Sequence, residues 1–187
     1  MPEGDTIFRT ARSMGRALAG KHVTGFRSTY PLLTRFNDDT PLTGQFVDSV
    51  ESRGKWLLIH FSGGGTLATH MLMRGSWHIY RPGERWQRPV SQMRILLENC
   101  DYQAVGFDVP VAQMHTARSL ARDKRIPQPG SDILSPNFDS LAAATRLLAC
   151  SNGEIGEVLL QCAVYLGVPQ ANSAFHVFER VLEEDGR

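Results

Sequence analysis

Apolar residues recur at helical spacing near the start of the chain. Ile7, Ala11, Met14 and Leu18 stand at positions i, i+4, i+7 and i+11, so they would line one face of an α-helix. Gly20 follows the last of them, and glycine commonly ends a helix. The pattern therefore predicts a first helix that buries this face and ends near Gly20.

From Lys21 to Phe107 the pattern changes to short strands separated by turns. The turns are marked by glycine and proline at Gly54, at 63–65, at Gly75 and at 81–83. Strands are predicted for 22–29, 44–51, 55–61, 66–72, 76–80, 92–98 and 102–107. Seven or eight short strands with frequent turns are typical of an antiparallel β-sandwich.

Strand signals end at Pro110 and helical periodicity follows. Helices are predicted for 111–124, 140–149, 154–166 and 169–185, and turn-forming residues at 126–132 indicate a boundary. The expected fold class is α+β. An N-terminal helix and an antiparallel β-sandwich occupy 1–110, and an all-α C-terminal region occupies 111–187.

Length and composition fit a folded protein without membrane attachment. The chain has 187 residues, of which 42% are apolar, and no apolar run approaches the roughly 18 residues of a membrane span. Glu3 and Asp5 do not fit a signal peptide. Cys100, Cys150 and Cys162 lack C-x-x-C spacing and are too few for a four-cysteine zinc site. We expect a cytoplasmic protein.

The net charge of +1 conceals two unlike halves. Residues 1–125 contain 17 Lys and Arg against 11 Asp and Glu, whereas residues 126–187 contain 3 against 8. A basic block suggests a polyanionic partner for the first part, although the Arg bias can equally reflect genome composition. Only Lys21, Lys55 and Lys124 are lysines, so a functional lysine has few candidates.

Pro2 and Glu3 are candidate catalytic residues. Removal of Met1 would leave Pro2 with a free secondary amine, and a free α-amino group has a pKa of about 7.7 to 8. Such an amine can attack an aldehydic carbon to give an iminium ion, an electron sink that permits elimination at the neighbouring carbon. Glu3 lies beside it as a proton donor or acceptor. Met-Pro starts are also common, and acids in a first helical turn are ordinary partners of the helix dipole.

Three motifs together resemble the formamidopyrimidine-DNA glycosylase and endonuclease VIII family. They are the start Met1-Pro2-Glu3-Gly4-Asp5-Thr6, the segment Ser52-Arg53-Gly54-Lys55-Trp56 and the segment His70-Met71-Leu72-Met73-Arg74-Gly75. The resemblance covers residues 1 to about 150, and Gly4-Asp5-Thr6 is most similar to the actinobacterial endonuclease VIII branch.

The resemblance implies a role for each matching residue. Pro2 is the Schiff-base nucleophile at C1′ of the sugar, Glu3 is the acid/base group, and Lys55 contacts a phosphate. Leu72, Met73 and Arg74 enter the gap left by the extruded base, with Met73 as the wedge. Alternatively, Met73 is a core methionine on a strand and Lys55 a solvated lysine in a turn. His60, His70 and His78 lack metal-ligand spacing and are expected to be structural or hydrogen-bonding groups.

Residues 111 to about 153 resemble the start of the family's helix-two-turn-helix domain, and the resemblance ends near Gly153. The family's Gly-Ile-Gly-Asn signature of a helix-two-turn-helix domain and its four-cysteine zinc finger are absent from the sequence, so no cofactor is expected. Residues 154–175 instead resemble the C-terminal helices of carboxymuconolactone decarboxylases, as in a recombined or misjoined reading frame. Such helices pack in homo-oligomers, which makes residues 159–185 a candidate interface; an intramolecular helical hairpin is the alternative.

These observations leave three functions open. The first is a bifunctional DNA glycosylase that removes an oxidised base, chiefly a pyrimidine, from damaged duplex DNA near the bacterial nucleoid and nicks the strand through a Pro2 iminium ion. The second is a non-catalytic or weakly active DNA-binding remnant of such an enzyme. The third is a decarboxylase-related oligomer fused to it.

Overall fold

The computed structural model describes residues 4–127 together with residues 151, 154, 176 and 179. The chain divides into a unit of Met1–Pro129 and a unit of Gly130–Arg187. The first unit contains nearly all of the described residues. The helices predicted for 140–149, 154–166 and 169–185 lie almost wholly outside them. No helix in the described part is long and apolar enough to cross a membrane.

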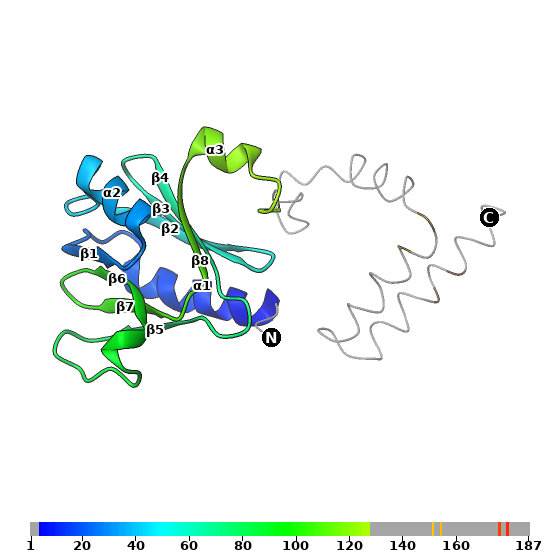
Figure 1. Cartoon of the computed structure of the whole chain (residues 1–187). Coiled ribbons are helices and arrows are strands. Elements are labelled where there is room, and N and C mark those ends of the chain that lie inside the picture. The colour runs from blue at the N-terminus through cyan, green and yellow to red at the C-terminus, as the bar shows by residue number, and fades with distance from the viewer. Residues whose placement is uncertain (1–3, 128–150, 152–153, 155–175, 177–178, 180–187) are drawn as a thin grey trace. The chain divides into compact units, whose positions relative to one another are not determined.

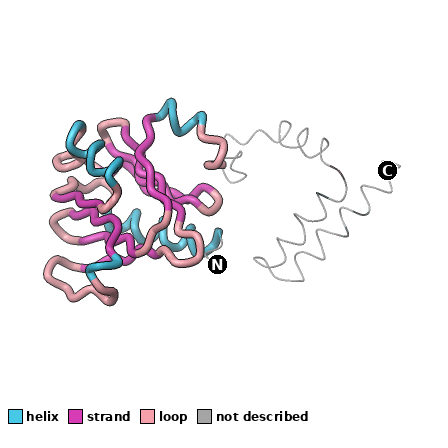
Figure 2. The backbone as a smooth tube through the Cα atoms, viewed as in Figure 1, coloured by secondary structure: helices cyan, strands magenta, loops and turns pink. Residues whose placement is uncertain are grey.

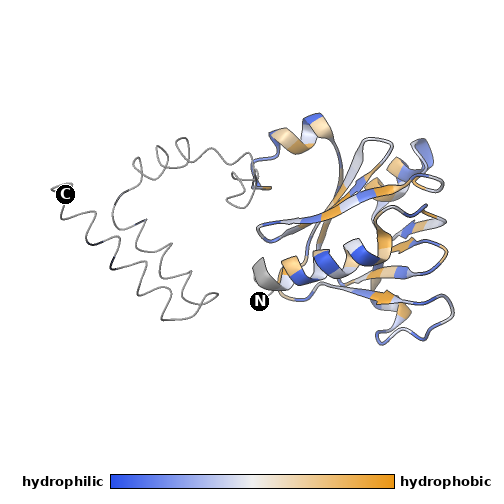
Figure 3. Cartoon of the chain, turned by 180° about the vertical axis from the view of Figure 1, so that it is seen from behind, coloured by the Kyte–Doolittle hydropathy of each residue, from blue (hydrophilic) through white to orange (hydrophobic). Residues whose placement is uncertain are grey.

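Helix α1 (Gly4–Leu18) confirms the first predicted helix. Ile7, Ala11, Met14 and Leu18 are all buried in the main core, while hydrophilic residues alternate with them along the visible face of the helix (Figure 3). The chain turns at Gly20, whose φ of +73° is a conformation that glycine adopts without the steric cost that a Cβ brings. The helix packs mainly against strand β2.

Within residues 4–127, eight strands form two antiparallel sheets of four, which confirms the predicted antiparallel sandwich of an α+β fold (Figure 1). One sheet has the order β1-β6-β7-β5 and the other the order β2-β3-β4-β8. Figure 2 shows the strands at the centre with the helices around them. The strand bounds are β1 Gly25–Ser28, β2 Val47–Arg53, β3 Trp56–Phe61, β4 Gly65–His70, β5 Ser76–Tyr80, β6 Met93–Glu98, β7 Gln103–Phe107 and β8 Val111–Thr116. A short 3-10 turn, η1 (Val90–Gln92), precedes β6.

Strand β3 is buried on both of its faces. Leu57, Ile59 and Phe61 point into the main core with α1 and the facing sheet. Trp56 and Leu58 point to the opposite face of the sheet, where Ala68, Leu120 and Ile126 complete a second cluster. Successive side chains of a strand alternate between faces, so this near-continuous apolar run serves two cores at once.

Two elements differ from the sequence expectation. The helix predicted for 111–124 is wrong at its start, because Val111–Thr116 is strand β8, which pairs with β4 along its whole length. The helix α3 (Ala117–Arg122) begins only after Thr116, whose side chain caps it. The interpretation failed because an edge strand obtains its backbone partners from a distant segment, which local periodicity does not reveal. Helix α2 (Pro31–Asp39), with proline in its first turn, was not predicted.

The buried side chain of Asn99 links the turn between β6 and β7 to the end of α1, and its contribution to stability can be measured. It is 5% exposed, its Nδ2 donates to the Ala17 carbonyl at 2.9 Å, and its Oδ1 accepts from the backbone N–H groups of Asp101 and Tyr102. We expect Asn99→Ala to lower the free energy of unfolding by about 2 kcal/mol, because three backbone groups lose their partner. Thermal unfolding would measure this, with the exposed Thr43→Ala as control; equal melting temperatures would contradict it.

Candidate active site

Lys55 lies in a two-residue turn between β2 and β3. Arg53 and Trp56 are paired across the hairpin, so Gly54 and Lys55 form its tip. Gly54 has a φ of +59°, and a Cβ built on it would approach the Pro127 ring to 3.2 Å. The hairpin thus requires glycine at this position, and it presents the lysine at the end of the strand pair.

The segment that resembles the family's wedge forms a tight turn between β4 and β5. The Gly75 N–H donates to the Met71 carbonyl at 2.8 Å, and a Cβ on Gly75 would lie 2.7 Å from that oxygen. Met71 is buried, whereas Leu72 and Met73 are 46% and 68% exposed and Arg74 is also exposed. Met73 therefore lies on a turn and in solvent, and the alternative of a core methionine on a strand is wrong.

His70 holds the turn in shape. The N–H of Leu72 donates to His70 Nδ1 at 3.1 Å, and Leu72 has a φ of +45°, which is uncommon for a residue with a side chain. The His70 ring meets Trp56 edge to face, with 5.1 Å between the ring centroids. Burial, and next the positive charge of Lys55, lower the pKa of His70. The neutral ring keeps Nδ1 free to accept from Leu72, which agrees with the structural or hydrogen-bonding role expected for His70.

The pairing of β3 with β4 places the β2–β3 hairpin turn and the β4–β5 turn at the same end of the strand pair. Trp56 is the register partner of His70, so Lys55 directly precedes one member of this pair and Met71 directly follows the other. Figure 1 shows the β2–β3 hairpin, the β4–β5 turn and the first turn of α1 at the same end of the unit. Ile7, in that first turn, shares the main core with Met71.

Pro2 and Glu3 lie outside the described residues, so the structure does not test their predicted roles. The described chain begins at Gly4, the first residue of α1. Lys55 lies in one of the two turns that leave this end of the β3–β4 pair, and Leu72, Met73 and Arg74 lie in the other.

His60 and His78 make contacts that fit structural roles. His60 lies between Glu51 Oε1 and Thr66 Oγ1, each at 2.9 Å from a ring nitrogen. His78 contacts Ser76 Oγ at 3.1 Å, and burial together with Arg88 lowers its pKa. No three of the His, Cys, Asp and Glu side chains that the structure describes are grouped so as to hold a metal ion.

The effect of Lys55 on His70 can be measured. We expect His70 to titrate below about pH 6.5, and Lys55→Gln to raise its pKa toward that value because the repelling charge is removed. Folded His70 binds fewer protons than unfolded His70, so its contribution to stability is complete above pH 6.5 and is lost as the pH falls through the folded pKa. Proton NMR of the ring would follow the titration. Lys21→Gln, which removes a lysine that lies beside Asp101, is the control; equal shifts in both variants would refute the contact.

Comparison with known proteins gives the family. The model of the formamidopyrimidine-DNA glycosylase N-terminal domain matches residues 1–109. The chain is 38% identical over 161 residues to a probable endonuclease 8 2 of Streptomyces coelicolor, covering 86% of this chain and 56% of that protein. It is 33% identical over 183 residues to the DNA-(apurinic or apyrimidinic site) lyase Nei2 of Mycolicibacterium smegmatis, covering 97% and 68%. The chain thus spans little more than half of the first of these relatives.

Solved structures show the same fold. MutM in complex with DNA containing carbocyclic 8-oxo-G matches with a TM-score of 0.56 at 20% identity, over 65% of this chain and 47% of that one. The Lactococcus lactis formamidopyrimidine-DNA glycosylase bound to DNA with an abasic site matches with a TM-score of 0.53 at 20% identity, over 65% and 46%.

The comparisons do not support the resemblance of the tail to decarboxylases. The Nei2 alignment runs over 97% of the chain and so extends into the segment on which that resemblance depends, most of which lies outside the described residues. By its matched domain, its relatives and its two-sheet fold, the chain belongs to the formamidopyrimidine-DNA glycosylase and endonuclease VIII family.

Proposed function

We propose that this chain acts as a DNA repair glycosylase with abasic-site lyase activity, which excises oxidised bases, pyrimidines in particular. The observation that carries the proposal is the meeting of a lysine-tipped hairpin and an exposed apolar turn at the end of the sandwich where α1 begins. A cation for a phosphate and an apolar side chain for a gap in the base stack are what an enzyme needs when it extrudes a base. Damaged duplex DNA is the proposed partner, in the bacterial cytoplasm.

The chemistry needs an amine, a carboxyl group and water. The Pro2 nitrogen attacks C1′ and the base leaves with its bonding electron pair. The C1′–O4′ bond then breaks as Pro2 loses its proton and O4′ gains one, which opens the sugar ring and leaves an iminium ion that withdraws electrons from C2′. Loss of a proton from C2′ then expels the 3′ phosphate, and hydrolysis of the iminium ion releases Pro2. Glu3 would transfer protons at the sugar. No step requires a metal or an organic cofactor.

The exposed apolar turn supports the wedge role. Leu72 and Met73 project two apolar side chains into solvent, where they add no buried apolar surface to the fold. Insertion into a base stack would remove apolar surface from water and offset the stacking that the extruded base loses. Lys55, one residue before Trp56 in the neighbouring hairpin, would hold the backbone beside the extruded nucleotide.

Two alternatives make different predictions. A non-catalytic or weakly active remnant would keep the fold and bind DNA without forming a covalent intermediate. A decarboxylase-related oligomer would associate through residues 159–185, but no comparison supports this alternative.

Covalent trapping tests the proposal directly. We expect incubation with abasic-site duplex and sodium borohydride to yield a protein–DNA adduct that maps to the N-terminal peptide, because reduction fixes an iminium ion at Pro2. Peptide mass spectrometry would locate it. Retention of Met1 should abolish trapping, since it converts the proline nitrogen into an amide.

A Lys55 variant distinguishes Pro2 from Lys55 as the nucleophile. Lys55→Gln should weaken DNA binding and still allow trapping at high protein concentration. An adduct on Lys55, or no adduct from folded protein, would show that Pro2 is not the nucleophile.

The wedge role predicts a difference between two substrates. Extrusion of a paired base costs a few kcal/mol, whereas a preformed abasic site has no base to extrude. We expect Met73→Ala to slow excision of an oxidised pyrimidine from duplex DNA by about tenfold or more, equivalent to about 1.4 kcal/mol, and to change strand nicking at an abasic site much less. Leu32→Ala, at the 80% exposed Leu32 of α2, is the matched control. Equal losses on both substrates would assign Met73 a structural role.

A further inference from the structure

A basic groove lies where the chain leaves β8. It has a volume of about 640 Å³. Its lining consists of the end of β8, helix α3 and the turn after it: His115, Thr116, Arg118, Ser119, Arg122, Asp123, Lys124 and Arg125. Four of these residues are cations and one is an acid. None of these residues lies in the Lys55 hairpin or in the turn between β4 and β5.

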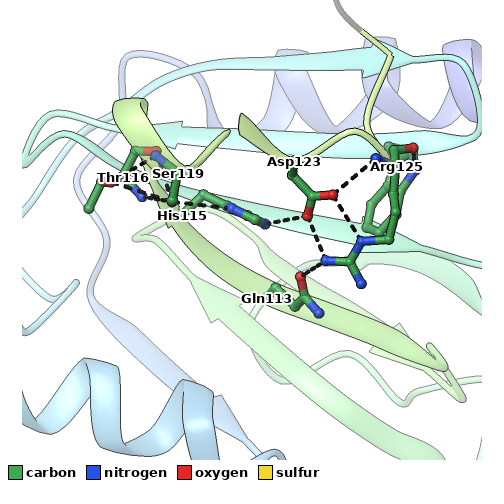
Figure 4. A network of polar contacts seen from close by, with 7 residues as sticks. Gln113, His115, Thr116, Ser119, Asp123 and Arg125 are labelled. Atoms are coloured by element: carbon green, nitrogen blue, oxygen red, sulfur yellow. Dashed lines mark hydrogen bonds and ion pairs between the residues drawn. The ribbon is translucent and has the colours of Figure 1, made fainter. Parts of the chain in front are cut away.

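The negative charge of Asp123, the single acid in the groove, is already paired with a neighbouring cation. Asp123 accepts from the backbone N–H of Arg125 at 3.0 Å and from its Nε at 2.9 Å, and these hydrogen bonds, chiefly those of the side chain, lower the pKa of Asp123 to about 2. Figure 4 shows the Arg125 guanidinium held between Asp123 and Gln113. Asp123 is therefore an anion at neutral pH, and its charge is matched by Arg125.

The other three cations have no such partner. Arg118, Arg122 and Lys124 are exposed, and within the described part of the chain none of them forms an ion pair. Like charges this close in sequence repel one another, and an anion in the groove would relieve the repulsion. Among the described residues, no acid therefore compensates the three positive charges of Arg118, Arg122 and Lys124.

The floor of the groove is polar and fixed. His115 is 7% exposed, with Nδ1 at 3.3 Å from Ser119 Oγ and Nε2 at 3.8 Å from Asp123 Oδ2. Its Nε2 has no hydrogen-bond partner among the described residues. The Ser119 and Thr116 side chains cap α3, which holds Arg118 and Arg122 on a formed helical turn.

The groove is joined to the Lys55 hairpin. The indole N–H of Trp56 donates to the Arg125 carbonyl at 2.9 Å, and Trp56 packs in one cluster with Leu120 and Ile126. Pro127 lies against Gly54, the residue before Lys55. The hairpin that carries Lys55 and the segment that carries Arg122, Lys124 and Arg125 are thus in direct contact.

We infer that this groove, through Arg118, Arg122 and Lys124, binds backbone phosphates of the duplex that flank the phosphate held by Lys55. The inference rests on the proposed function for its ligand. Duplex DNA carries one charge per about 1.7 Å of its axis, so a chain of phosphates can occupy several cations in a row, which a small anion cannot do. The contact of Trp56 with Arg125 and of Gly54 with Pro127 places the groove next to the hairpin that carries Lys55.

Salt dependence of binding tests this. Log affinity falls with log salt with a slope of about 0.9 per phosphate neutralised, so the double variant Arg122→Gln/Lys124→Gln should reduce the slope by about 1.8. The probe is a fluorescent undamaged duplex, titrated by anisotropy at several KCl concentrations. Arg81→Gln/Arg85→Gln, which removes two exposed arginines from the β5–β6 loop, is the matched control and should change the slope much less.

Each outcome is decisive. A slope equal to that of the control variant would overturn the inference, as would competition by millimolar inorganic phosphate with no change of the duplex slope, which would mark a small-anion site. Arg118→Gln, at a third exposed residue, should reduce the slope by about 0.9 and guards against a folding defect in the double variant. Borohydride trapping separates the two proposals: trapping with an unchanged slope removes only the groove, and a reduced slope without trapping removes only the lyase.

Discussion

The pairing of β3 with β4 is the constraint on which the rest of this structure depends. Its register opposes Trp56 to His70, and a shift by one residue would exchange the two faces of β3. Leu57 and Ile59 would then leave the main core, and Trp56 and Leu58 would enter it. Because both faces of the strand are buried, a shift by one residue in either direction would misplace side chains in both cores. Packing on two sides therefore fixes the register.

The same register positions the candidate site. The β2–β3 hairpin and the β4–β5 turn begin where this strand pair ends, so their separation is determined by the ladder and not by the loops themselves. Sites built on rigid elements keep their geometry better than sites on free loops. The backbone positions of Lys55 and Met73 are thus set by the sheet, although both residues lie in turns.

Trp56 connects the apolar turn with the basic groove at α3. Its ring meets the His70 ring edge to face, and His70 shapes the apolar turn; its N–H donates to the carbonyl of Arg125 in the groove. Its side chain is buried, so loss of the hydrogen-bond partner of its N–H would be costly. A substitution at this one position would disturb the turn and the groove together.

Local periodicity explains which parts could be predicted. The α1 stripe follows the helical period, and the seven strands from β1 to β7 are short runs bounded by turn-forming residues, so each carries its own signal in the sequence. Strand β8 does not, because Val111–Thr116 is half-buried along most of its length and is stabilised by its pairing with β4. For the site, Lys55 and the apolar turn came from motif resemblance. The role of His70 depends on a backbone N–H of a residue with positive φ, a feature that only coordinates reveal.

The apolar turn shows why the surrounding contacts are needed. A residue such as Leu72 at positive φ costs about 1 kcal/mol, and two exposed apolar side chains add nothing to folding. The turn persists because Met71 anchors one end in the core, Gly75 closes it and His70 accepts from Leu72. These contacts order the turn when the protein folds, so in the proposed role the entropy of ordering would not be lost again on insertion into a base stack. The His70 acceptor, whose pKa is lowered by burial and by Lys55, is one of the contacts that hold the turn in this conformation.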